Sequence, residues 1–151
     1  MSKPILIWTS IALFALLGLF LIAFGTLYAS VNGMLFFHAA AVPEAARHDV
    51  TPLYLALMKL IGGASIGLGL LGLYVTFGPL RAGARGAAAA LAVTYAIPVL
   101  MAAYVAETLA TITGAPTSWH IMGVLLAITG LAFGAWVVAA PWRRVESGPR
   151  R

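Results

Sequence analysis

The chain contains no cysteine, and this absence removes several classes of function. Disulfide bonds, thiolate catalysis, iron–sulfur clusters and cysteine-based zinc sites all depend on the thiol side chain. The sequence therefore excludes these four.

Charged residues are also scarce. They make up 9% of the 151 residues, whereas a soluble domain carries about 25%. Hydrophobic residues reach 62%, and the mean hydropathy is +1.01. This balance predicts an integral membrane protein. The net charge of +5 does not indicate nucleic-acid binding, because the basic residues lie at the ends of apolar segments rather than on one exposed face.

Four apolar runs are each long enough to cross a bilayer, which takes about 20 helical residues. We place these spans at residues 4–30, 51–77, 86–113 and 118–140. Pro52 suits the first turn of the second helix, and Gly78-Pro79 is expected to end it. The predicted fold is all-α, with a single four-helix membrane bundle over 1–142 and a basic tail over 143–151.

Basic residues are divided unevenly between the two sides of this bundle. If the N-terminus is cytoplasmic, one basic residue, Arg47, lies outside, and Lys59 falls within a span. The seven that lie inside are Lys3, Arg81, Arg85, Arg143, Arg144, Arg150 and Arg151. Cytoplasmic loops carry the excess of basic residues. Both termini are therefore predicted to be cytoplasmic, and in a bacterium the protein would lie in the inner membrane.

The connection 31–50 is long and lies on the outer side in this topology. Within it, "GMLFFHAAAV" is apolar but too short to span the bilayer, which favours an interfacial or a re-entrant helix. The connection also holds His38, Glu44, His48 and Asp49, which carry side chains that bind metals. Their spacing matches no specific zinc motif, so a solvated loop is favoured and no metal site is predicted.

Lys59 interrupts an otherwise apolar span. It lies eight residues past Thr51, which places its Cα about 12 Å below the outer edge. Glu107 lies six residues before Thr113 on the outward-running third span, about 9 Å below the same edge. An isolated charge at this depth is costly. Similar depth and opposite charge therefore predict that Lys59 and Glu107 are partners.

Other polar side chains gather in the same outer half of the bundle. Tyr104 shares a helical face with Glu107, and His120 begins the fourth span. Asn32 follows the first span, and Tyr54 begins the second. One interpretation is an outward-facing pocket in which Lys59 and Glu107 are candidate acid–base residues and the other four contact a ligand. The other is a structural ion pair that holds the second and third spans in register.

Small residues follow Lys59 in the second span. Gly62, Ser65 and Gly69 share one face, while Gly63 and Gly67 form a G-x-x-x-G pair on another. Small residues allow helices to approach closely in lipid. We therefore expect tight packing on at least two sides, with room for a protein partner in addition to membrane lipids.

A proline lies in the middle of the third span. Pro98 should kink this helix and free a backbone carbonyl near Thr94. The favoured interpretation is a kink against which the neighbouring helices pack, and the alternative is a kink that opens a cavity below Glu107.

The stretch "KLIGGASIGLGLL", from Lys59 to Leu71, resembles a feature of small four-span bacterial proteins of the DoxX-like type. The length, the four helices and the cytoplasmic termini are similar as well. Such families include proteins associated with quinone or sulfur redox chemistry. The resemblance implies a redox-linked membrane role but assigns no catalytic residue.

Two functions remain open at this point. The first is an accessory or assembly subunit of a larger membrane complex, because the bundle has extra small-residue faces and no complete catalytic motif. The second is an enzyme or binding protein for a quinone, isoprenoid or sterol-like molecule, with the pocket at Lys59 and Glu107. An ion pathway is disfavoured, since no acidic residue or histidine lies in the inner half of any span. The sequence identifies no cofactor.

Overall fold

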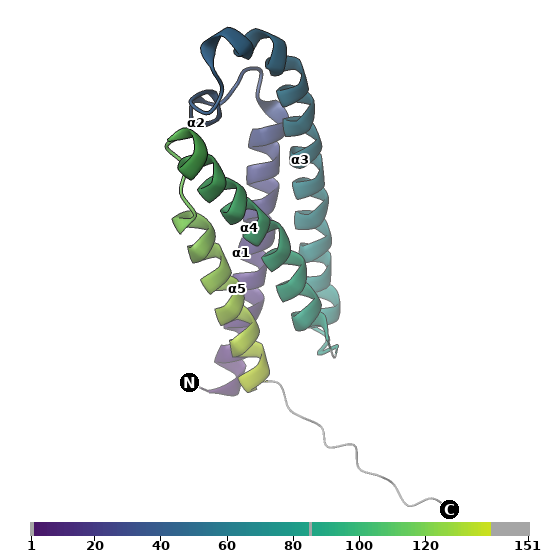
Figure 1. Ribbon diagram of the computed structural model, residues 1–151. Coiled ribbons are helices and arrows are strands. Elements are labelled where there is room, and N and C mark those ends of the chain that lie inside the picture. The colour runs from purple at the N-terminus through teal and green to yellow at the C-terminus, as the bar shows by residue number, and fades with distance from the viewer. Residues whose placement is uncertain (1, 85, 140–151) are drawn as a thin grey trace, which may run out of the picture.

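The computed structural model describes residues 2–84 and 86–139, and all regular structure within these ranges is helical. Figure 1 shows the arrangement. The elements are α1 (Lys3–Ser30), α2 (Phe36–Ala39), the short 3-10 helix η1 (Glu44–Ala46), α3 (Arg47–Val75), the π-helix η2 (Thr76–Leu80), α4 (Ala87–Thr113) and α5 (His120–Ala139). The predicted basic tail over 143–151 lies outside the described residues.

Four of these helical segments are long and apolar enough to cross a membrane. They are α1, the continuous segment from η1 to η2, α4 and α5. Successive long helices run in opposite directions, so the first residues of α1 and the last of α5 lie at the same end of the bundle (Figure 1). The prediction of an all-α protein with four helices long and apolar enough to cross a membrane is confirmed for the described residues.

The second span is longer at both ends than the sequence suggested. Its α-helix α3 begins at Arg47, so Pro52 lies inside the helix. The Thr51 hydroxyl donates to the Arg47 carbonyl at 2.6 Å. Gly78-Pro79 does not end the span, because the chain continues through the π-helix η2. The Arg81 N–H donates to the Thr76 carbonyl at 3.2 Å, five residues back. This wider turn relieves the clash that a proline ring makes in an α-helix.

Helices α1 and α3 meet along a seam of glycines. Gly25 opposes Gly62 and Gly18 opposes Gly69, so the two antiparallel helices each contribute glycines seven residues apart. A Cβ at Gly62 would lie 2.5 Å from the backbone nitrogen of Ala29 and the same distance from the Gly25 carbonyl. The backbones are therefore in direct contact, as expected for small residues between helices in lipid.

The buried core is concentrated in the half of the bundle where α1 begins. Here Phe14, Leu80, Leu91 and Tyr95 are almost completely buried. Helix α4 packs on α5 and on η2 but touches α3 itself at few positions. Figure 1 shows α4 running obliquely from the last residues of α3 to the first residues of α5. The last half of α4 consequently diverges from the first half of α3.

Candidate functional site

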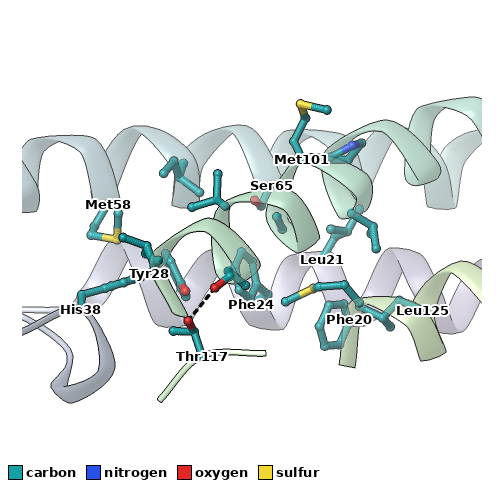
Figure 2. A pocket seen from close by; sticks show the side chains of 18 residues that line it. Phe20, Leu21, Phe24, Tyr28, His38, Met58, Ser65, Met101, Thr117 and Leu125 are labelled. Atoms are coloured by element: carbon teal, nitrogen blue, oxygen red, sulfur yellow. Dashed lines mark hydrogen bonds between the residues drawn. The ribbon is translucent and has the colours of Figure 1, made fainter. Parts of the chain in front are cut away.

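A cavity of about 400 Å³ lies between the four long helices. Figure 2 shows its 18 lining residues, which come from α1, α3, α4 and α5, together with His38 of α2 and Thr117 of the α4–α5 connection. Pro98 contributes to the wall of this cavity. The volume falls within the range of about 300–1,000 Å³ that is typical of small-molecule sites.

One wall of the cavity is a row of aromatic rings on α1. Phe20, Phe24 and Tyr28 follow each other every four residues and therefore share one helical face. The ring centroids of Phe20 and Phe24 are 6.1 Å apart, and those of Phe24 and Tyr28 are 4.2 Å apart. The Tyr28 and His38 rings continue the row edge to face at 6.4 Å. The wall presents flat apolar surface along the cavity and ends at His38.

Three methionines complete the lining, one from each of the other long helices: Met58 of α3, Met101 of α4 and Met122 of α5. Methionine is unbranched and polarisable, so it adapts to irregular apolar shapes and makes favourable contacts with aromatic rings. These residues give the lining an adaptable apolar group on each of the three helices.

The lining has few polar groups and includes no lysine, arginine, aspartate or glutamate. The polar groups are Tyr28, His38, Ser65 and Thr117. The Thr117 hydroxyl donates to the Ala106 carbonyl at 2.7 Å, which is the dashed line in Figure 2. Tyr28 and His38 lie toward the Met58 end in this view, whereas Phe20, Leu21 and Leu125 lie at the opposite end. The cavity therefore has one polar end and one apolar end.

His38 is held in place by Tyr54. Its Nδ1 lies 2.9 Å from the Tyr54 hydroxyl, and the same hydroxyl oxygen accepts a hydrogen bond from the Leu35 N–H at 3.3 Å. These bonds fasten the short helix α2 to α3. Burial lowers the pKa of the His38 imidazole, which favours its neutral form.

Part of the cavity lining on α3 and α4 is also exposed on the bundle surface. Ile61 of α3 and Met101 and Val105 of α4 line the cavity and are 41%, 58% and 52% exposed. Helices α3 and α4 have few contacts with each other, so they leave this side of the cavity less covered.

Lys59 and Glu107 do not line this cavity, although the residues before them, Met58 and Ala106, do. Lys59 lies on the exposed face of α3 with Gly63 and Gly67, four and eight residues further on. Glu107 is exposed on α4. Among the described residues, the one carboxylate within ion-pairing distance of a basic group is Asp49, whose Oδ1 lies 3.2 Å from Nδ1 of His48. The expected Lys59–Glu107 pair is therefore not formed, and both side chains are exposed.

Of the other four residues predicted to contact a ligand, three are exposed and one is bonded to a residue of the cavity lining. Tyr104 is 68% exposed, and Asn32 is exposed beyond α1. His120 is exposed, contacts the Ser118 hydroxyl and stacks on Trp119 with centroids 4.6 Å apart. Tyr54 is the one of these residues that the structure connects to the cavity, through its bond to His38.

Sequence reasoning considered His38 only as a metal ligand and did not single out Tyr28. The repeat of aromatic residues at 20, 24 and 28 was the available signal, since four-residue spacing places them on one face. Within residues 2–84 and 86–139, no group of three metal-binding side chains comes together.

No family model matches the chain, and neither a curated protein nor a solved structure is significantly similar to it. The resemblance to DoxX-like proteins stays a prediction.

Proposed function

We propose that this protein binds an uncharged lipophilic small molecule within the membrane, of the quinone, isoprenoid or sterol-like kind. The ligand would occupy the cavity between the four helices and reach it from the lipid between α3 and α4. The cavity itself carries the proposal, because its volume of about 400 Å³ suits a small molecule and its lining is almost entirely apolar.

The chemistry of the lining favours a neutral ligand. A charged headgroup would lose its hydration without meeting an opposite charge, because the lining includes no lysine, arginine, aspartate or glutamate. Catalysis is less well supported than binding. The acid–base pair envisaged from the sequence, Lys59 and Glu107, lies on the outer surface of the bundle rather than in the cavity.

The proposed setting is the inner membrane of a bacterium, with both termini cytoplasmic and the polar end of the cavity toward the outer side. The division of basic residues, seven on one side and Arg47 on the other, supports this orientation. Labelling of single cysteines introduced at Ser2 and at Glu44 in intact cells tests it, since only the cysteine at 44 should react with an impermeant maleimide.

A variant that fills the cavity tests the binding function. Ala102 lines the cavity from α4, whereas Ala89 is exposed on the same helix and does not line it. The protein is extracted directly from its membranes into nanodiscs and analysed by native mass spectrometry. The wild type and Ala89→Trp should carry a small molecule of discrete mass, and Ala102→Trp should lack it.

Thermal unfolding of each variant shows whether Ala102→Trp is folded. If it is not, Ser65→Leu provides a smaller obstruction at the α3 side of the same cavity. The proposal fails if a folded, obstructed variant retains the same adduct as the wild type, or if none of the proteins carries any.

A second candidate function is an accessory subunit of a larger complex. It is supported by the exposed face of α3, where Ala56, Lys59, Gly63 and Gly67 lie together. A Cβ added at Gly63 or Gly67 meets nothing within 4 Å, so a helix of another protein has space to approach. Gly67→Leu should abolish co-purification of a stoichiometric partner in mild detergent, whereas Ala90→Leu on exposed α4 should not. Co-purification that survives Gly67→Leu would exclude this face as the interface.

A further inference from the structure

The polar end of the cavity is built around one imidazole whose two nitrogens have different surroundings. Nδ1 of His38 is engaged by the Tyr54 hydroxyl at 2.9 Å. His38 also lines the cavity. The ring nitrogen left for a ligand is therefore Nε2, and its proton decides what kind of group can bind there.

The hydrogen bonds around Tyr54 determine where this proton lies. The Tyr54 oxygen already accepts from the Leu35 N–H at 3.3 Å, so its own hydrogen needs an acceptor. Nδ1 of His38 is the acceptor within reach. If Tyr54 donates to Nδ1, the neutral imidazole carries its single proton on Nε2. Nε2–H is then a hydrogen-bond donor directed by the fold.

The other polar groups of the lining are not fixed as hydrogen-bond donors. Tyr28 and Ser65 carry hydroxyls that rotate and can donate or accept. The Thr117 hydroxyl donates its hydrogen to the Ala106 carbonyl, so toward a ligand it can act only as an acceptor. His38 is accordingly the group that distinguishes one ligand headgroup from another.

We propose that the ligand carries a carbonyl oxygen at its outer end, which accepts a hydrogen bond from Nε2–H of His38, with Tyr54 acting as the positioning residue. This inference rests on the proposed binding function and specifies its ligand class: neutral, lipid-soluble molecules with a terminal carbonyl. Tyr28 lies beside the headgroup, since its ring is 6.4 Å from that of His38. The apolar body of the ligand extends along Phe24 and Phe20 toward Leu125.

The experiment uses geranylacetone as a probe, together with the alcohol made by reducing its ketone and the hydrocarbon that lacks the oxygen. The full-length protein is placed in nanodiscs of diether phosphatidylcholine, a lipid without a carbonyl group. Equilibrium binding is measured for the three probes. The ketone should bind more tightly than the hydrocarbon by roughly two- to tenfold, the range expected for one hydrogen bond in a buried site. The alcohol should gain less than the ketone.

Isotope-edited infrared spectroscopy of ketone labelled with carbon-13 at the carbonyl gives a second readout. A hydrogen bond to His38 should shift the carbonyl band of the bound probe to lower frequency. His38→Phe keeps a ring at this position but removes the donor, so it should abolish both the shift and the preference for the ketone. His38→Gln supplies an amide N–H and should restore part of both. Tyr54→Phe should weaken the shift without abolishing binding, because the Nε2 tautomer is no longer imposed.

His48→Phe is the matched control, since the side chain of His48 is 98% exposed and lies away from the cavity lining. If the three probes bind equally and His38→Phe leaves the carbonyl band unchanged, the carbonyl inference is wrong while the binding function stands. If the alcohol binds best and His38→Phe removes that preference, His38 presents an acceptor and the assigned tautomer is wrong; if the preference survives His38→Phe, His38 does not select the headgroup. The native molecule is the one that the wild type carries and Ala102→Trp lacks. If none of the three probes displaces it, the ligand is of another class.

Discussion

The hydroxyl of Tyr95 occupies the space in which Gly72 would carry a side chain. A Cβ built on Gly72 would lie 2.6 Å from Cζ of Tyr95 and closer still to its hydroxyl oxygen. The same hydroxyl lies 3.0 Å from the corresponding position on Gly18. One tyrosine of α4 thus inserts between α1 and α3, and it holds the three helices together where the cavity ends.

This contact predicts an energetic coupling between Gly72 and Tyr95. Gly72→Ala should destabilise the protein by about 1–3 kcal/mol, because the core must accommodate an atom where there is no space. Tyr95→Phe should cost little or stabilise, since the buried hydroxyl has no hydrogen-bond partner. The double variant should be more stable than the sum of the single changes predicts. Chemical or thermal unfolding in detergent measures this, and strict additivity would contradict the observed packing.

The glycines of α3 predict opposite effects at neighbouring positions. Gly62→Ala places a methyl group 2.5 Å from the backbone of α1 and should destabilise strongly. Gly63→Ala, one residue later, meets nothing within 4 Å and should be neutral or stabilise by up to about 1 kcal/mol through helix propensity. The difference between the two melting temperatures is the measurement. Equal effects would show that α1 and α3 do not meet along this seam.

His38 predicts a dependence of stability on pH. Burial lowers its pKa in the folded protein. Between that lowered value and the unperturbed value of about 6.5, the unfolded chain binds more protons than the folded one. The contribution of His38 is therefore complete above about pH 6.5 and is lost as the pH falls below it. His38→Gln should flatten the slope of melting temperature against pH in this window, and His48→Gln should leave that slope in place.

Lys59 and Glu107 are predicted to act independently. Lys59→Met and Glu107→Gln each remove a charge from the exposed surface of the bundle, and neither breaks an ion pair in the described chain. Their effects on stability should add to within about 0.5 kcal/mol, as for separate sites. A double-mutant cycle in nanodiscs provides the test. A coupling well above this limit would place the two charges in contact in the membrane.

Several features of the fold could be predicted from local sequence. The four long apolar helices follow from hydropathy and length. The second helix extends past Pro52 and past Gly78-Pro79, where it was expected to begin and to end. Proline and glycine indicate only a local preference, and at Gly78-Pro79 a π-helical turn allows the helix to continue.

The expected contact between Lys59 and Glu107 is not formed, for a geometric reason. Counting residues placed Lys59 and Glu107 at similar depth, and their neighbours Met58 and Ala106 do line the same cavity. Depth along a helix follows from the rise per residue, but the direction of a side chain relative to other helices does not. Successive side chains on a helix point in directions about 100° apart, so a residue next to one that lines the cavity can lie on the outer surface.

The sequence by itself determined that this is a four-span helical membrane protein without thiol chemistry and with a predicted orientation, because hydrophobic length, composition and the positions of basic residues are properties of each segment alone. Only the tertiary structure decided which residues line the cavity. The glycine contacts between α1 and α3 and the oblique path of α4 set the rotation and separation of the helices. These relations between distant segments bring His38, Tyr54 and the aromatic face of α1 to one cavity and leave Lys59 and Glu107 outside it.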